Sequence, residues 1–219
     1  MASSREIVLG RIRSALAADD HSPQVVERVY ERQGLLPPGS EQAVELLIDR
    51  LIDYKALVRR ANPESLAAVI DDALAAVASV VVPAGLPTGV AAACGQRGRV
   101  VTVDGDPSVL TPDELDGIDV VVTCARVAIA LSGTIILDGE TDQGRRAISL
   151  VPDRHLIILH AGQVVETVAE AIALLEPTRP LTMISGPSAT SDIELERVEG
   201  VHGPRTLEVI IVAADQPRD

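Results

Sequence analysis

The sequence contains no phenylalanine and no tryptophan, and Tyr30 and Tyr54 are its two tyrosines among 219 residues. Proteins that bind single-stranded nucleic acids usually stack the bases on aromatic side chains, and this chain cannot build such a platform. Its core must therefore be filled by valine, isoleucine, leucine and alanine. Each large aliphatic side chain stabilises a fold by roughly 1.5–3 kcal/mol when it is fully buried.

Positive charge is also scarce, because 19 lysines and arginines face 32 aspartates and glutamates and leave a net charge of −13. General nucleic-acid binding depends on basic side chains that neutralise phosphates, so we expect no nucleic-acid partner. A small anion can still bind, because a local arginine and strand-end amides act at short range while salt screens the distant charges.

The chain has two cysteines, Cys94 and Cys124, and neither belongs to a CxxC motif or lies near a pair of histidines. An iron–sulfur cluster usually needs four thiolates, and a structural zinc needs four ligands at characteristic spacings. We therefore expect buried or free thiols, and no metal or cofactor bound by this chain.

Long apolar runs are missing as well. The first twenty residues are interrupted by Arg5, Glu6, Arg11 and Arg13, which leaves no continuous apolar region of the kind found in signal peptides. No segment approaches the roughly 20 apolar residues that a membrane span requires. The sequence thus predicts a cytoplasmic protein without a membrane span.

Residues 1–54 are predicted to form an N-terminal helical extension. Apolar residues recur at helical spacing over 5–18 and, more strongly, over 40–52. A further helical segment is expected to begin at Ser22–Pro23 and to stop at Gly34. These apolar stripes need a partner surface, so we interpret the extension as a lid or a dimerisation arm. The same pattern makes a homo-oligomer possible.

From Lys55 onward, predicted strands alternate with predicted helices, which indicates one α/β domain over residues 55–219. We expect a mostly parallel sheet flanked by helices on both faces. The chain has no GxGxxG after a strand, no GxxxxGK[ST] phosphate loop and no GxSxG elbow. The predicted strands cover 56–59, 79–82, 99–103, 119–123, 135–137, 156–159, 181–184 and 207–212.

Two polar turns, each adjoining one of the last two apolar runs, form the main candidate site. We expect both runs to lie in one sheet and both turns to meet in a cleft at the carboxyl ends of the strands. Hydroxyl groups and amides would supply neutral donors for an anion, and Arg205 would supply a planar charged fork for a carboxylate or phosphate. The predicted ligand-binding residues in these turns are Ser185, Gly186, Pro187, Ser188, Thr190, Gly203 and Arg205.

The same turns allow a plainer interpretation. Gly–Pro pairs are turn signals in their own right, and Asp192 could cap a short helix. Arg205 could pair with Asp192 or Glu194 and only brace the two turns.

Gly133 and Thr134 complete the predicted ligand-binding set. A Gly–Thr step between apolar segments lets the backbone approach a ligand closely, so Gly133→Val would damage binding more than folding. The alternative is a corner between a helix and a strand. Arg145 and Arg146 are read as solvated surface or as an anion clamp, and His155 as a satisfied residue at a strand end.

The stretches SGTIILDGETDQGRRAISLVPDRHLIIL and ISGPSATSDIELERVEGVHGPRTLEVIIV resemble the LUD-domain family, the lactate-utilisation protein C group. The resemblance covers most of the chain from about Lys55. It implies a fold similar to the ribose-5-phosphate isomerase, glucosamine-phosphate deaminase and CoA-transferase superfold. It also implies a role in an iron–sulfur-dependent system that oxidises L-lactate to pyruvate. One departure is that Ala130, Leu131 and Ser132 supply no acidic residue before Gly133, where the family often has one.

Two functions remain open at this point. In the first, the chain is an accessory or ligand-binding subunit that binds a small anionic metabolite, while partner subunits of the lactate-utilisation system carry the iron–sulfur clusters. In the second, it is a stand-alone isomerase or CoA-transferase-like enzyme acting on a phosphorylated or CoA-linked small molecule. The candidate catalytic residues are then Asp192 or Glu194 as base or nucleophile and His202 as proton carrier. The sequence favours the first function.

Overall fold

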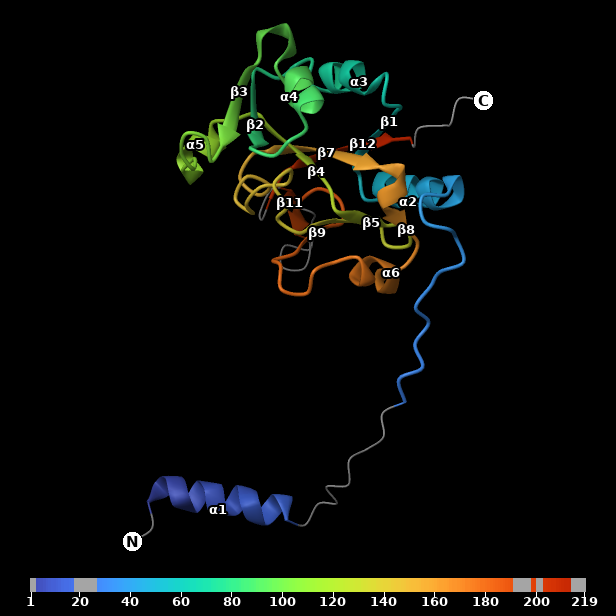
Figure 1. The fold of residues 1–219 in the computed structure, drawn as a ribbon. Helices are drawn as coiled ribbons and strands as arrows, with labels where there is room; N and C mark the ends of the chain where they lie inside the picture. Colours follow the sequence, from blue (N-terminus) through green and yellow to red (C-terminus); the bar gives the residue numbers. More distant parts are fainter. Residues whose placement is uncertain (1–2, 18–26, 191–197, 200–202, 214–219) are drawn as a thin grey trace. The chain divides into compact units, whose positions relative to one another are not determined.

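The computed structural model describes residues 3–17, 27–190, 198–199 and 203–213, and its contacts divide the chain into two units, Met1–Glu31 and Arg32–Asp219 (Figure 1). In the first unit, α1 (Ser4–Leu16) begins with a capping box between Ser3 and Glu6, and none of its residues is buried. Residues 27–34 contain no regular secondary structure. The prediction of a helix that ends at Gly34 is therefore wrong for residues 27–34, the part of that segment that the structure describes.

The second unit is organised around a six-stranded sheet in which every pair of neighbouring strands is parallel. This confirms the predicted α/β class with a mostly parallel sheet. The strands, in spatial order, are β1 (Leu57–Ala61), β12 (Thr206–Val212), β7 (Arg154–His160), β4 (Val120–Cys124), β2 (Ser79–Pro83) and β3 (Val100–Asp104).

One face of this sheet is covered by α3 (Leu66–Ala73) and α4 (Thr88–Cys94) (Figure 1). Side chains of a strand point alternately to opposite faces, so every second residue of each central strand meets these helices. Leu156 and Ile158 of β7 do so, together with Ile210 and other aliphatic side chains of β12, β4 and β2. The core here is entirely aliphatic apart from small residues, as the lack of aromatics requires.

The opposite face carries a second sheet that the sequence did not reveal. Its four strands, in spatial order, are β8 (Val164–Val165), β5 (Val127–Ile129), β6 (Thr134–Leu137) and β9 (Thr182–Ile184). Its inner face packs with α2 (Glu41–Asp53) on the large sheet, and α6 (Val168–Ala173) packs on its outer face (Figure 1). The expectation that β9 and β12 lie in one sheet is therefore wrong, because β9 pairs with β6.

The helix α2 belongs to the core of the second unit. Ser40 caps it, and Ala43, Val44, Leu47 and Leu51 are buried against the large sheet. The contacts accordingly divide the chain between Glu31 and Arg32, whereas the sequence placed the boundary after residue 54. The apolar face of α2 is therefore filled by its own domain.

The remaining elements are short. Capping boxes at Thr111 and Thr167 begin α5 (Pro112–Asp116) and α6. Among the described residues no helix is long and apolar enough to cross a membrane. The other short elements are η1 (Gln96–Gly98), η2 (Ala161–Gln163) and the antiparallel pair β10 (Ala189–Thr190) and β11 (Val198–Glu199).

Candidate functional site

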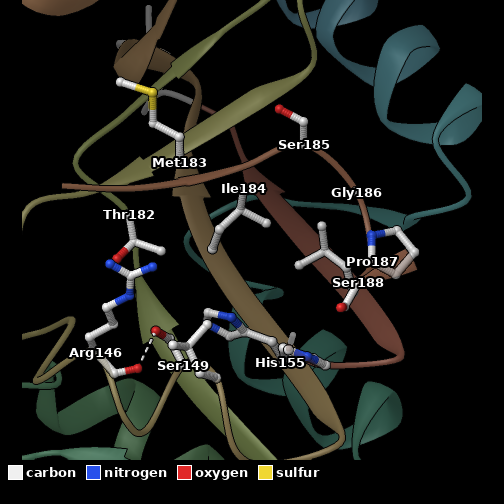
Figure 2. A pocket seen from close by; sticks show the side chains of 14 residues that line it. Arg146, Ser149, His155, Thr182, Met183, Ile184, Ser185, Gly186, Pro187 and Ser188 are labelled. Atoms are coloured by element: carbon white, nitrogen blue, oxygen red, sulfur yellow. Dashed lines mark hydrogen bonds between the residues drawn. The ribbon is translucent and has the colours of Figure 1, made fainter. Parts of the chain in front are cut away.

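A pocket of about 300 Å³ opens between the two sheets, at the amino ends of β7 and β12. Figure 2 shows Arg146, Ser149 and His155 along one side of it and the segment 182–188 along the other. The described residues that line it are Arg146, Ser149, Leu150, His155, Thr182, Met183, Ile184, Ser185, Gly186, Pro187, Ser188, Gly203, Pro204 and Leu207.

Strand register places the floor of this pocket. Leu156 and Ile158 face α3 and α4, so the alternating residues His155 and Ile157 face the second sheet. His155 is paired in register with Leu207 of β12, and both residues line the pocket. Because each is the second residue of its strand, the pocket lies at the amino edge of the parallel sheet. The predicted position at the carboxyl ends of the strands is therefore wrong.

The two predicted turns meet at this pocket. The amide of Ser188 donates a hydrogen bond to the carbonyl oxygen of Pro204, at 2.9 Å. Ser185, Gly186, Pro187 and Ser188 approach from the end of β9, whereas Gly203 and Pro204 precede β12. The turns converge although their strands belong to different sheets, because the second sheet packs on the face of the large sheet to which Leu207 of β12 belongs.

His155 is the most deeply buried polar residue of the pocket wall, with 1% of its surface exposed. Its Nε2 lies 2.8 Å from the hydroxyl oxygen of Thr123, which is itself fully buried in β4. Burial lowers the pKa of His155 to about 3, so the imidazole is neutral at physiological pH. The sequence interpretation of a satisfied strand-end histidine missed its place in the pocket.

The two adjacent arginines that the sequence left open have different surroundings. Arg145 donates to the buried carboxylate of Asp104, with Nε 2.7 Å from Oδ2, and so has a structural role. Arg146 is exposed and lines the pocket, and its guanidinium has no ion-pair partner among the described residues. Its backbone carbonyl accepts a hydrogen bond from the hydroxyl of buried Ser149 (Figure 2). The GRR sequence signalled this positive charge but not which arginine supplies it.

Gly133 and Thr134 lie outside the pocket wall. The hydroxyl groups of Thr134 and Ser185 are 2.8 Å apart, and that of Thr134 is equally close to Ser132. Gly133 has φ of 60°, and a Cβ on it would lie 2.8 Å from Cβ of Arg50 in α2. The glycine is thus required by a corner between two strands, β5 and β6, and by helix contact.

Close packing also explains why residue 186 is a glycine. Its φ is 89°, and a Cβ there would lie 2.8 Å from Cβ of Tyr54, directly after α2. The turn after β9 is thereby held against the end of α2 while its other side lines the pocket. The close approach expected at a Gly–Pro turn exists here, but it is an approach to Tyr54.

Arg205 makes a forked ion pair with Asp153, with Nε 2.6 Å from Oδ1 and 2.9 Å from Oδ2. Both side chains are more than half exposed, and Arg205 does not line the pocket. This contact has the bracing character of the alternative interpretation, with an acid that the sequence had not suggested.

The remaining candidates are not placed at the site. Thr190 lies in β10. Asp192, Glu194 and His202, the predicted catalytic residues, lie outside the described residues. No aspartate or glutamate stands among the described residues that line the pocket.

Both cysteines are free and buried. Burial raises the pKa of Cys94 to about 11 and that of Cys124 to about 12, so both thiols are protonated at neutral pH. Within the described ranges, no group of three or more His, Cys, Asp or Glu side chains could hold a metal ion. These thiols are therefore poor ligands for a cluster, which binds thiolates.

This geometry defines a class of α/β domain. A second sheet packs on one face of the parallel sheet, and a pocket lies between the two sheets. Residues 110–212 match the LUD domain, and they include every described residue that lines the pocket. The chain is 48% identical over 168 residues to "Lactate utilization protein C" of Deinococcus radiodurans, covering 75% of this chain and 76% of that protein. The chain belongs to the LUD-domain family.

Two further comparisons agree with this assignment. "Lactate utilization protein C" of Bacillus subtilis is 32% identical over 100 residues, which is 42% of this chain and 41% of that protein. The crystal structure of a DUF162 family protein from Deinococcus radiodurans superposes with a TM-score of 0.66 and 39% sequence identity. That comparison covers 78% of this chain and 96% of the other.

Proposed function

We propose that this chain is a ligand-binding accessory subunit of a cytoplasmic iron–sulfur-dependent system that oxidises L-lactate to pyruvate. Partner subunits supply the clusters, and this chain binds a small anionic metabolite in the pocket between its two sheets. The names of the two relatives support the link to lactate utilisation. The protonated, buried thiols of Cys94 and Cys124 support the assignment of the clusters to partners.

The observation that carries the ligand-binding role is Arg146 at the mouth of this pocket. Its guanidinium is a positive charge that no described acid compensates, in a chain whose net charge is −13. A volume of about 300 Å³ suits a small metabolite. The described wall offers arginine, serine and imidazole groups but no carboxylate, so it supports anion binding and does not supply the carboxylate base or nucleophile of the alternative enzyme.

Calorimetric titration with L-lactate and with pyruvate tests the ligand-binding role. We expect the purified chain to bind at least one of them, and Arg146→Ala to weaken binding by about tenfold or more, because it removes a charge-assisted contact. Arg11→Ala is the matched control, since Arg11 is an exposed arginine of α1 in the other unit. Equal affinities of the two variants would contradict the assignment of this pocket.

The subunit role is tested separately by metal analysis. We expect the chain purified without oxygen to contain no stoichiometric iron or acid-labile sulfide. Lactate oxidation should appear when cysteine-rich partner subunits are added. Iron in the isolated chain, with the visible absorption of a cluster, would contradict this division of roles.

A further inference from the structure

The floor of the pocket contains the buried imidazole of His155, in which one ring nitrogen makes no hydrogen bond to a described residue. Nε2 of His155 is engaged by the hydroxyl of Thr123, at 2.8 Å. Nδ1 has no hydrogen-bond partner among the residues that the structure describes. Only 1% of His155 is exposed, and this residue lines the pocket. Nδ1 itself is not among the fully buried polar atoms that lack a partner, so it is accessible from the pocket, where a hydrogen bond to a ligand atom can form.

The ring is fixed by its surroundings. His155 lies between β4 and β12 in the middle of the sheet, in register with Val121 and Leu207, which are both buried. Thr123, two residues after Val121 in β4, is fully buried. A ring held by neighbours on both sides and by one hydrogen bond presents its other nitrogen in a constant direction.

We propose that Nδ1 of His155 hydrogen-bonds to the oxygen atom next to the ligand's carboxylate, while Arg146 binds the carboxylate itself. The ligand class is then the small 2-hydroxy acids and the 2-oxo acids derived from them. This inference rests on the proposed function and assigns the groups in the pocket that recognise each part of the metabolite.

Thr123 explains how one histidine serves both members of such a pair. A hydroxyl can donate to Nε2, which leaves the proton on Nδ1, or accept from Nε2, which leaves Nδ1 as an acceptor. The first tautomer donates to the carbonyl of a 2-oxo acid, and the second accepts from the hydroxyl of a 2-hydroxy acid. Both tautomers are neutral, as burial of the ring requires.

Two substitutions at His155 separate the two nitrogens. The amide of glutamine reaches the place of Nε2, so His155→Gln keeps a partner for Thr123 and removes the ligand contact. The amide of asparagine takes the place of Nδ1, so His155→Asn keeps the ligand contact. We measure binding of L-lactate and of propionate, which lacks the hydroxyl, to the wild type and to both variants by calorimetry.

We expect the wild type to prefer L-lactate over propionate by about tenfold, the size of one well-made hydrogen bond. His155→Gln should lose this preference and bind both acids with the wild-type affinity for propionate. His155→Asn should retain most of it. A preference that persists in His155→Gln, or that is absent from a wild type that binds both acids, overturns the inference alone. A wild type that binds neither L-lactate nor pyruvate overturns the proposed ligand role and this inference with it.

A measurement on the wild type replaces the variants if they do not fold. Nitrogen-15 spectra of histidine-labelled protein report the protonation and hydrogen bonding of each ring nitrogen. We expect saturating L-lactate to shift the Nδ1 signal of His155 and propionate to leave it unchanged. Equal responses to both acids overturn the inference.

Discussion

Glu208 forms two ion pairs inside the fold, and we expect its substitution to lower the free energy of unfolding strongly. Its side chain is fully buried in β12, where its carboxylate accepts from Arg59 of β1 and from Arg154 of β7. Removing one partner of a buried ion pair typically costs about 3–5 kcal/mol, because the remaining charge is left uncompensated. Arg59 is 37% exposed and already pairs with Asp72, so it can remain solvated. We therefore expect Glu208→Gln to cost about 3 kcal/mol.

Urea unfolding with linear extrapolation measures this cost, provided that the slopes of the variant and the wild type agree. Glu45→Gln is the matched control, since Glu45 pairs with Arg60 at the surface and 58% of its side chain is exposed. A surface pair is worth at most about 1 kcal/mol. If the two variants lose the same stability, the buried carboxylate does not hold β1 and β7 together, and the reasoning fails.

Three further predictions concern Gly133, Arg205 and His155. Gly133→Val should lower stability by about 1–3 kcal/mol and leave L-lactate affinity unchanged in the folded fraction, because φ is positive and Arg50 lies in the way; Gly10→Val, with open space around it, is the stability control. Arg205→Lys loses the fork to exposed Asp153, so urea unfolding should show a loss below about 1 kcal/mol, and a drop in L-lactate affinity would contradict bracing. The pKa of His155 is lowered to about 3, so its contribution is complete above the unfolded pKa of about 6.5 and is lost as pH falls towards 3. Between pH 6.5 and 4.5 the wild type should lose about 1.4 kcal/mol per pH unit more than His155→Gln, and parallel curves would refute this.

Local signals in the sequence predicted local structure well. The capping boxes at Thr111 and Thr167 each join residues three positions apart, so the start of each helix depends on local sequence alone. The central strands β2 and β4 are apolar runs, because a strand inside a parallel sheet is buried on both faces. A pattern of this kind depends on the chain's immediate neighbours and needs no knowledge of the rest of the fold.

The second sheet was not predicted because two of its four strands, β5 and β8, carry almost no local signal. β8 has two residues and β5 has three, all of them buried, so neither shows alternation. Their partners are distant in the chain: β5 pairs with β8, and β6 pairs with β9. Runs this short cannot be told from loop or helix segments by periodicity.

The two arginines at 145 and 146 show the same limit at the site. Arg145 pairs with Asp104, which is forty-one residues away in the chain. Arg146 therefore is the arginine of this pair that lines the pocket. The buried Arg99 is similar, because it donates to the carbonyls of Leu74 and Cys94, at the ends of α3 and α4. The sequence indicates that a buried arginine needs acceptor groups. It does not indicate which ones, because the acceptors are distant in the chain.

The position of the pocket has a physical cause in the loop 138–144. Open α/β sheets usually bind ligands at the carboxyl ends of strands where the strand order reverses, which is here between β2 and β4. In this chain the amide of Gly85, after β2, donates to the carbonyl of Thr141, and the amide of Cys124, at the end of β4, donates to that of Asp142. A Cβ on Gly85 would lie 2.4 Å from Cβ of Thr141, so the loop is packed directly on this edge. The chain's own backbone thus occupies the usual ligand position, and the pocket forms at the opposite edge, where the second sheet leaves His155 within reach of a ligand.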